Sequence, residues 1–497
     1  MQKQNLKSPL EGFLSIFSEI KSGEGFSALL LMFNIFLILT SYYIMKPVRE
    51  ALILSGGTAN ISGAVIKSYT AAGQVILLMF AVPLYSYIAG RIPRRRLINV
   101  ITIFFVACLV VFYILALSKV PIGIIFFLWI GIFNLMIPAQ FWAFANDVYT
   151  PEAGKRIFVI IAFGASSGAA LGGIITDILI EPLGIYQLLL VAGTLLFISL
   201  ILTNIVEARE KTTREVHTMA MKDKEPEPID KSGAFKLVFK SKYLLMIAFL
   251  MMFLNWVNTT GEFILGQTVE NTAKGNVSKS EIQRSAEHFA LEHLKTDMPN
   301  DPNVKSATSI KELEGRNKEK AQKYTQEFNN QYIKQFIGNF YAKFLTVVNL
   351  AGLLMQLFLV SRILKYLGVR VALLILPFVA LGGYFLIAIF PVLSVIRWAK
   401  TAENSIDYSL QNTVRQVLFL PTTKEEKYKA KQAIDTFFWR AGDLLSTALV
   451  GIGTTWLAFQ TRQFAIVNIV LVIIWIILAI FIGIENQRRT SFTVNEN

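Results

Sequence analysis

Ionisable side chains occur inside stretches of this chain that are otherwise apolar enough to cross a membrane. Lys46, Arg49 and Glu50 lie near the end of the apolar stretch 26–54, and a period of 3.6 residues places all three on one helical face. A lysine or arginine at the centre of a membrane helix costs roughly 2.5 to 3.5 kcal/mol on insertion scales. This face therefore predicts water, a counter-charge or an anionic ligand beside it. An ion pair of Lys46 with Glu50 is the structural alternative.

Charge recurs in three further apolar stretches. Arg397, Lys400 and Asp407 follow one another at helical spacing, and three ionisable groups this close together in a membrane favour a binding role over a structural one. Glu262 ends the polar run NWVNTTGEF inside another apolar stretch. Lys67 lies near the start of a fourth, where a lysine that snorkels to the surface is as good an interpretation as one that binds a ligand.

Other side chains in these stretches suggest less direct roles. Three aromatic residues could stack on a planar ligand, although packing against neighbouring helices is the commoner role: Tyr42, Tyr43 and Trp142. Four charged residues lie near the ends of apolar stretches, and we expect them to form gate or structural pairs between helices: Asp147, Asp435, Arg440 and Asp443.

The composition excludes several classes of protein. Of the 497 residues 54% are hydrophobic and only 16% are charged, which is too apolar for a soluble protein of this size. Cys108 is the only cysteine, and the three histidines lie outside the apolar stretches, so the sequence predicts no disulfide, no metal site and no enzyme. The net charge of +14 resides in short loops beside apolar stretches, which argues for membrane topology and against nucleic-acid binding.

Twelve apolar stretches of about bilayer length predict an all-α polytopic membrane protein. They are 26–54, 63–89, 97–118, 122–147, 156–179, 184–206, 243–266, 336–361, 369–390, 392–419, 432–458 and 463–485. Several are longer than a bilayer requires, so tilted or protruding helices are expected. Loops on one side, such as GRIPRRRL, are rich in arginine and lysine. The positive-inside rule therefore places both termini in the cytoplasm, with the protein in the inner membrane of a cell.

The apolar stretches fall into two halves. Residues 1–206 and 243–497 each hold six of them, and the charged segment 207–242 is a predicted cytoplasmic linker. The halves echo each other, because YSYIAGRIPRRRL follows the second stretch and VSRILKYLGVRVAL follows the eighth. Two parallel six-helix repeats around a central cavity resemble the major facilitator architecture. The polar insert 268–334 is predicted to lie outside, as a small helical cap or, equally, as a solvated hairpin.

Four longer motifs resemble the nucleotide transporter family, the ATP/ADP exchangers of intracellular bacteria and plastids and their bacterial relatives. They are YYIMKPVREALILSGG, FWAFANDVYTPEAGKRIFVIIAFGASSGAALGG, NWVNTTGEFIL and YSLQNTVRQVLFLPTTKEEKYKAKQAIDTFFWRAGD. The resemblance implies nucleotide exchange or proton-driven uptake without hydrolysis, and it adds Arg415 to the candidates. Two departures stand out: the middle of the fourth stretch lacks the exchangers' glutamate, and Arg49-Glu50 stands where they have a Lys-Asp pair.

The sequence therefore predicts a secondary transporter of nucleotides in a lipid bilayer, without a cofactor and with no protein partner evident. No GxxxxGK[ST] motif occurs, so ATP would be cargo and not fuel. The candidate substrate-binding residues are Lys46, Arg49, Glu50, Lys67, Glu262, Arg397, Lys400, Asp407 and Arg415. Two alternatives stay open: a proton-coupled carrier of another anionic or phosphorylated metabolite, and a membrane scaffold or receptor that uses the insert.

Overall fold

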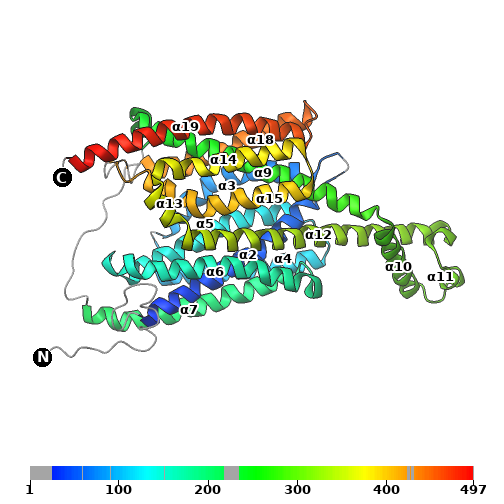
Figure 1. Ribbon diagram of the computed structural model, residues 1–497. Helices are drawn as coiled ribbons and strands as arrows, with labels where there is room; N and C mark the ends of the chain where they lie inside the picture. Colours follow the sequence, from blue (N-terminus) through cyan, green and yellow to red (C-terminus); the bar gives the residue numbers. More distant parts are fainter. Residues whose placement is uncertain are drawn as a thin grey trace.

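The computed structural model describes residues 25–58, 60–89, 91–149, 151–217, 234–422, 426 and 430–495, and its regular structure there is helical throughout (Figure 1). The N-terminal bundle contains α2 (Gly25–Leu54), α3 (Gly63–Ala89), α4 (Arg94–Leu117), α5 (Gly123–Val148), α6 (Pro151–Leu183) and α7 (Gln187–His217). The uninterrupted long helices of the C-terminal bundle are α9 (Lys242–Val277), α12 (Gly315–Phe358), α14 (Gly368–Ile389) and α19 (Thr461–Asn495). These ten helices of the described residues are long and apolar enough to cross a membrane.

Two composite helices complete the C-terminal bundle. One consists of α15 (Leu393–Ile406), the π-helical segment η3 (Asp407–Gln411) and α16 (Asn412–Val417). The other consists of α17 (Lys431–Ala433), the π-helical segment η5 (Ile434–Phe438) and α18 (Trp439–Thr455). They correspond to the predicted stretches 392–419 and 432–458, so each predicted span has a helical counterpart. π-Helical turns are rare overall but frequent at functional sites.

The segment predicted as a linker is helical at both of its ends. Helix α7 continues beyond the predicted boundary at residue 206 as far as His217, and α8 (Ala234–Lys240) precedes α9. Residues 218–233 lie outside the described part of the chain. Charge alone does not end a helix, because a helix that leaves the bilayer can continue into water with its backbone fully hydrogen-bonded.

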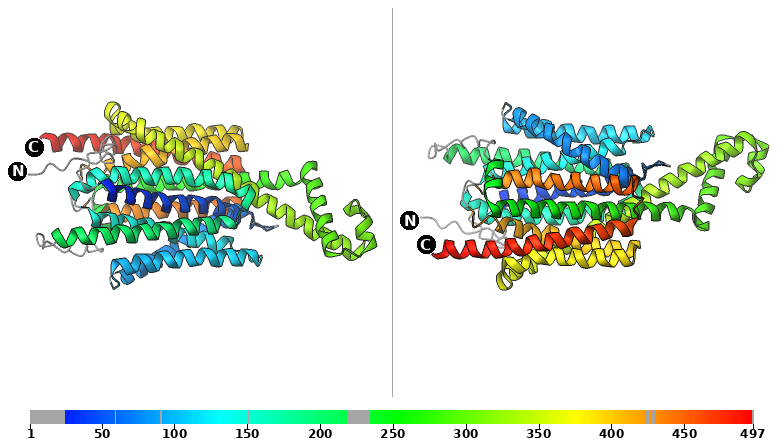
Figure 2. Two further views of the ribbon diagram at one scale, coloured as in Figure 1. Left: turned by 90° about the horizontal axis from the view of Figure 1, so that it is seen from below. Right: turned by 90° about the horizontal axis from the view of Figure 1, so that it is seen from above.

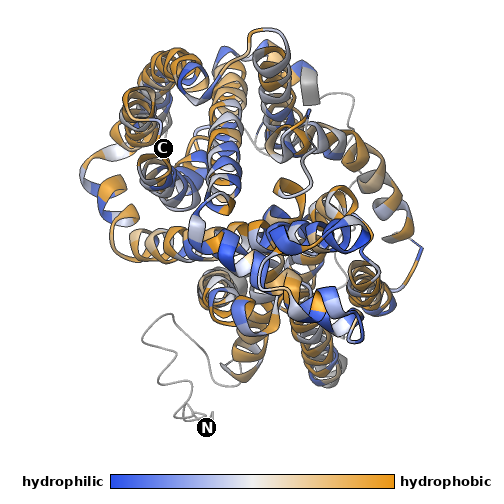
Figure 3. Cartoon of the chain, turned by 90° about the vertical axis from the view of Figure 1, so that its right-hand side faces the viewer, coloured by the Kyte–Doolittle hydropathy of each residue, from blue (hydrophilic) through white to orange (hydrophobic). Residues whose placement is uncertain are grey.

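The outer surface of the helices is strongly apolar. Phe80, Ile125, Ile178 and Phe481 are more than half exposed, and the helices are mostly orange in Figure 3, whereas the insert facing the viewer is mainly blue. Large exposed patches of this kind are rare on soluble monomers. Lipid is therefore the solvent of this surface, as the composition predicts.

A stripe of small residues brings the central helix α2 very close to α6. A Cβ atom added to Gly164, Gly168 or Gly172 would lie 2.3, 2.4 or 2.7 Å from a backbone carbonyl oxygen of α2. Small residues at a spacing of four let two membrane helices approach until their backbones touch. This contact holds α2, which carries the first cluster of charges, in a fixed position within its bundle.

The insert forms a helical cap at one end of the molecule (Figures 1 and 2). Its helices α10 (Ser280–Asp297) and α11 (Pro302–Ser306) lie between extensions of α9 and α12 that run beyond the bundle. A small hydrophobic cluster that includes Leu294, Val304 and Leu313 is fully buried inside the cap. Of the two predicted forms, the structure is the helical cap, because this cluster gives its helices a core of their own.

Candidate functional site

The charged residues of α2 and α3 form a buried triad. The Glu50 carboxylate accepts hydrogen bonds from the Arg49 guanidinium and lies 2.7 Å from the Lys67 amine. The exposed fractions of the Arg49, Lys67 and Glu50 side chains are 15%, 12% and 3%. Lys67 therefore does not snorkel to the surface, and Glu50 pairs with these two cations in place of Lys46. Two cations on one carboxylate give the triad a formal charge of +1.

Lys46 lies outside this triad, and the Glu50 carboxylate does not pair with it. Its amine lies 5.2 Å from the centre of the Tyr43 ring, 5.6 Å from that of Tyr408, and 3.5 Å from the Tyr408 hydroxyl. In the part of the chain that the structure describes, it forms no ion pair. Tyr43, Lys46 and Arg49 are the partly exposed positions of this segment of α2. Since Tyr408 belongs to η3, Lys46 lies where the two bundles meet.

A second triad belongs to the C-terminal bundle and has the opposite charge. The Lys400 amine is fully buried and lies 3.0 Å from Glu403, 3.7 Å from Glu262 and 2.8 Å from the Asn258 amide oxygen. The Tyr384 hydroxyl donates to Glu403 at 3.0 Å. Two carboxylates on one amine give a formal charge of −1. Glu262 is the open member of this triad, because 27% of its side chain is exposed.

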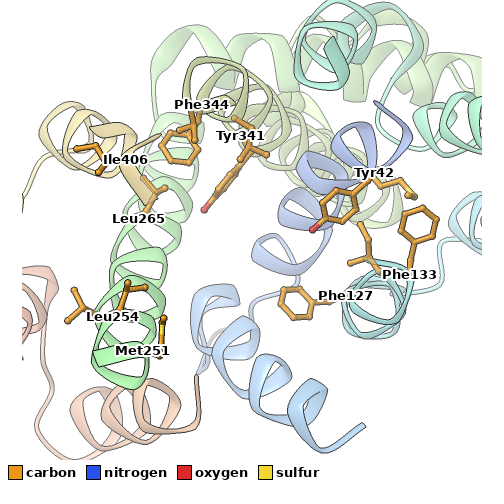
Figure 4. Close-up of a cluster of buried hydrophobic side chains, with 14 of the residues drawn as sticks. Tyr42, Phe127, Phe133, Met251, Leu254, Leu265, Tyr341, Phe344 and Ile406 are labelled. Atoms are coloured by element: carbon orange, nitrogen blue, oxygen red, sulfur yellow. The ribbon is translucent and has the colours of Figure 1, made fainter. Parts of the chain in front are cut away.

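The two triads face each other across the interface between the bundles. Helix α3, which carries Lys67, packs against α9, which carries Glu262 and belongs to the opposite bundle. Tyr341 of α12 also lies between them, since its ring is 5.7 Å from the Lys67 amine and its hydroxyl points toward α9 in Figure 4. A residue with a side chain in place of Gly261 would push into this site, because an added Cβ would lie 2.1 Å from the Tyr384 hydroxyl and 2.9 Å from the Lys400 amine.

The remaining predicted binding residues lie apart from this centre. Arg415 of α16 is 3.8 Å from Asp407, further along the same composite helix. Arg397 lies beside the rings of Phe340 and Trp398, and Trp398 is 60% exposed on the outer face. Arg397 thus shares a helix with Lys400 but not its surroundings, and a binding role for it stays a prediction.

The aromatic candidates differ in how far packing already covers them. The Tyr42 ring stacks on Phe133 and is buried (Figure 4). Trp142 packs against Phe141 and Phe158 within its own bundle. Tyr43 is partly exposed beside Lys46, which leaves it as the predicted stacking residue with an open surface.

The predicted gate pairs also separate into different groups. Arg440 binds Asp443 at 3.2 Å, and Asp443 accepts further hydrogen bonds from Asn255 and Thr259 of α9. Asp435 belongs to a pocket at the end of the bundle opposite the insert. The side chain of Asp147 lies outside the described part of the structure. Their roles as gates stay predictions.

A closed contact between the bundles involves Glu270, which the sequence does not single out. The fully buried Glu270 carboxylate accepts from the backbone N–H groups of Gly63 and Ala64, each at 2.9 Å, at the first turn of α3. Thr447 also donates to the carbonyl of Ser68 at 3.1 Å. These contacts join α9 and α18 to α3 and close the interface on the side of the insert. The nearest signal in the sequence is the spacing of Glu270 and Lys274, which form an i,i+4 ion pair.

Further ion pairs and hydrogen bonds join the bundles on the same side. Lys119 lies 2.6 Å from Glu327, and Lys343 lies 3.8 Å from Asp177. Among the described residues, no group of three or more His, Cys, Asp or Glu side chains could hold a metal ion. The site is thus built from ion pairs, amides and tyrosines, and its free cation is Lys46.

Two six-helix bundles with buried opposite charges between them define a polytopic membrane transporter. The sequence profile described as "Major Facilitator Superfamily" matches residues 24–269. The chain is similar to this superfamily, and the match supports a secondary transporter that works by alternating access. The predicted fold class is confirmed. The match is to the superfamily as a whole and does not single out the nucleotide transporters.

Solved structures share this fold at low sequence identity. The nucleoside transporter NupG has 13% identity and a TM-score of 0.56, over 91% of this chain and 98% of NupG. A D-xylose-proton symporter has 12% identity and a TM-score of 0.56, over 92% and 97% of the two chains. A POT family transporter in complex with 5-aminolevulinic acid has 14% identity and a TM-score of 0.55, over 93% and 96%. None of the curated proteins matches the chain.

Proposed function

We propose that the protein transports nucleotides, or closely related phosphorylated anions, by exchange or uptake across the membrane. The observation that carries this proposal is Lys46, a cation that lies at the meeting of the two bundles between two tyrosine rings and without a carboxylate partner. A charge kept in the membrane without a partner is costly. An anionic substrate that pairs with Lys46 once per transport cycle would explain why the protein keeps this costly charge.

The surroundings of Lys46 favour a phosphate-bearing substrate. Arg49 and Lys67 lie on the same side of the interface and outnumber Glu50, so several negative charges can be offset there. Hydrogen bonds between charged groups are about twice as strong as neutral ones, and Arg suits the oxygens of a phosphate. Tyr43 and Tyr408 offer aromatic faces next to these cations, which suits a base joined to phosphates.

The motifs that resemble the nucleotide transporters support the same substrate class, because they contain Tyr43, Lys46, Arg49, Glu50 and Tyr408; Lys67 lies outside them. The solved relatives support the fold alone, and the substrates in their names differ from one another: a nucleoside for NupG, a sugar for the D-xylose-proton symporter. Lys400 takes a different role from Lys46 in this proposal. Its amine is already surrounded by Glu262, Glu403 and Asn258, so it holds Glu262 in place and does not meet the substrate first.

The test is nucleotide binding and exchange by purified protein, with matched lysine and arginine variants. We expect ATP or ADP to raise the melting temperature and to exchange in proteoliposomes. Lys46→Gln should weaken binding about 10- to 150-fold, the equivalent of about 1.5–3 kcal/mol for a hydrogen bond to a charged group. Arg362→Gln removes an exposed cation outside the central site and serves as the control, with unchanged affinity. Equal affinities of wild type and Lys46→Gln would contradict the proposal.

A proton-coupled carrier of another anionic metabolite is the second candidate, and the C-terminal triad favours it. Glu262 and Glu403 share one amine, so the triad has an excess negative charge that a proton can neutralise. Uptake driven by a pH gradient into proteoliposomes without internal nucleotide distinguishes this carrier from an exchanger. Glu262→Gln should then abolish the dependence on the gradient, whereas in an exchanger it should slow turnover at every pH.

A further inference from the structure

A second cationic site lies in the C-terminal bundle at the end opposite the insert. A pocket of about 300 Å³ opens between α16 and the composite helix α17–η5–α18. This volume is at the lower end of the range for small-molecule sites. The pocket is separate from the central triads, because its walls are residues further along both composite helices.

The charges that line the pocket are predominantly positive. Among the described residues that line the pocket, Arg415, Lys431 and Arg440 supply three cations and Asp435 supplies one carboxylate. The partners of these cations leave them available to a ligand. Lys431 donates to the neutral amide oxygen of Gln416. Arg415 is 3.8 Å from Asp407, a long ion pair. Arg440 is 3.2 Å from Asp443, whose carboxylate also accepts from Asn255 and Thr259 and so shares its charge with α9.

The backbone on both sides of the pocket is unusual. The π-helical segment η3 ends at Gln411, immediately before α16, and η5 ends at Phe438, immediately before Trp439. A π-helical turn in each wall rotates the residues that follow it, and such turns are frequent at functional sites. Inside η3, the amide of Gln411 is fully buried and neither of its polar atoms has a hydrogen-bond partner. This unpaired buried amide costs stability, so packing alone does not explain why Gln411 stands in the η3 wall of the pocket.

An aromatic side chain lies within the same pocket. The Arg415 guanidinium lies over the Trp439 ring, 4.7 Å from its centre, so the flat faces of both groups are already held in place. A planar guanidinium fixed on a ring presents its N–H groups in a set direction, which suits phosphate oxygens.

We propose that this pocket is a second anion site, which receives the phosphate groups of the substrate on the membrane face opposite the insert. The proposal rests on the function proposed for the central site and adds to it a place where substrate docks before it reaches Lys46 or after it leaves. The insert-facing side is closed by Glu270, so the opposite face is the side to which substrate has access in this conformation. Loop charges predict that this face is cytoplasmic.

The first test measures binding to the pocket without transport. Pyrophosphate is the probe, and the readout is the tryptophan fluorescence of the detergent-purified protein, in which Trp439→Phe identifies the signal of the pocket. We expect a saturable change in wild type that is lost in Trp439→Phe and shifted about tenfold or more to higher concentration in Lys431→Gln/Arg440→Gln. Arg362→Gln/Lys365→Gln removes two cations elsewhere on the chain and should not shift it. A signal that is absent, or equally strong in the Lys431→Gln/Arg440→Gln variant, would overturn the site.

The second test asks whether the site serves the transport cycle. Nucleotide KM is measured from each face, in intact cells and in inside-out vesicles. Lys431→Gln/Arg440→Gln should raise KM on the face opposite the insert about tenfold or more and leave KM on the insert-facing side unchanged. Equal changes on both faces, or none, would overturn the proposed role. If wild type transports no nucleotide, the central proposal fails, while the pyrophosphate measurement still decides whether the pocket binds anions.

Discussion

Replacement of Glu270 by glutamine should open the insert-facing side of the protein. Both oxygens of the buried carboxylate accept backbone N–H groups of α3, each at 2.9 Å, where the helix dipole adds to the attraction. Glutamine keeps the shape but replaces one acceptor by a donor, so one N–H of Gly63 or Ala64 loses its partner. An unsatisfied buried donor costs about 1–3 kcal/mol, and this cost falls on the closed state. The population of the open state should therefore rise about 5- to 150-fold.

A reporter cysteine beneath this contact measures the change. Ser68 is 8% exposed, and its carbonyl accepts from Thr447 of the other bundle, so Ser68→Cys in a Cys108→Ser background should react slowly with an impermeant maleimide. Labelling should accelerate by about the same 5- to 150-fold when Glu270→Gln is added, because the reagent reaches residue 68 through the open state.

Lys274→Gln is the matched control for this experiment. The Lys274 amine binds the same carboxylate at 2.6 Å, but 44% of its side chain is exposed, and exposed pairs of this kind contribute about 0.3–0.5 kcal/mol. Its effect on labelling should stay near twofold. If Glu270→Gln labels no faster than Lys274→Gln while both proteins keep their melting temperature, Glu270 is not a gate.

Three further predictions concern the site and the cap. Gly261→Ala should reduce transport severely, because its methyl group would lie 2.1 Å from the Tyr384 hydroxyl and overpacking of this kind costs about 1–3 kcal/mol. Gly275→Ala is the control, because a methyl group there meets nothing within 4 Å. Equal transport rates of the two variants in proteoliposomes would refute the argument. Replacement of residues 280–313 by a glycine-serine linker should leave transport intact, because Glu270 and Glu327 remain; complete loss of transport would favour a scaffold or receptor role. Hydrogen bonds from the Ser309 hydroxyl and the Ile310 N–H lower the pKa of Glu287 below its ordinary value of 4.5, so the cap should be most stable above that pH and should lose stability as the pH falls through the lowered pKa. Hydrogen exchange of residues 280–313 measures this. Glu287→Gln should show a smaller acid effect than Glu292→Gln, whose exposed carboxylate lies 3.7 Å from the exposed His288.

The membrane-spanning helices were predictable because the hydrocarbon core of a bilayer admits only long apolar helices here. A backbone in hydrocarbon must pair all its polar groups internally, so apolar length alone gave α3 its bounds of 63 and 89. Hydropathy could not place the outer ends of α9 and α12, because these helices continue into water, where polar residues no longer oppose a helix. The π-helical turns at 407–411 and 434–438 have no signature in the residue order and depend on how the neighbouring helices pack.

The identities of the charged residues were predictable, but their partners were not. Lys46, Glu262 and Lys400 stand out in the sequence because charge in a membrane is rare. That Glu50 pairs with Lys67 of the next helix, and not with Lys46 one turn away, is decided by the packing of α2 against α3. Glu270 escaped attention because it lies in a polar segment, where a carboxylate is unremarkable until the fold brings it to the start of α3.

Because α12 extends far beyond the bilayer, the cap at its outer end should amplify any rotation of the bundles. Its 44 residues span about 66 Å at 1.5 Å per residue, and a bilayer core accounts for only about 30 Å of that. When the bundles rock against each other, each degree of rotation moves the far end of the remaining 36 Å by about 0.6 Å. The ion pair of Lys119 with Glu327 joins this arm to the N-terminal bundle. A fluorescent pair at the cap and at the loop of Lys119 would read the motion of the transporter from outside the bilayer, without a label in the cavity.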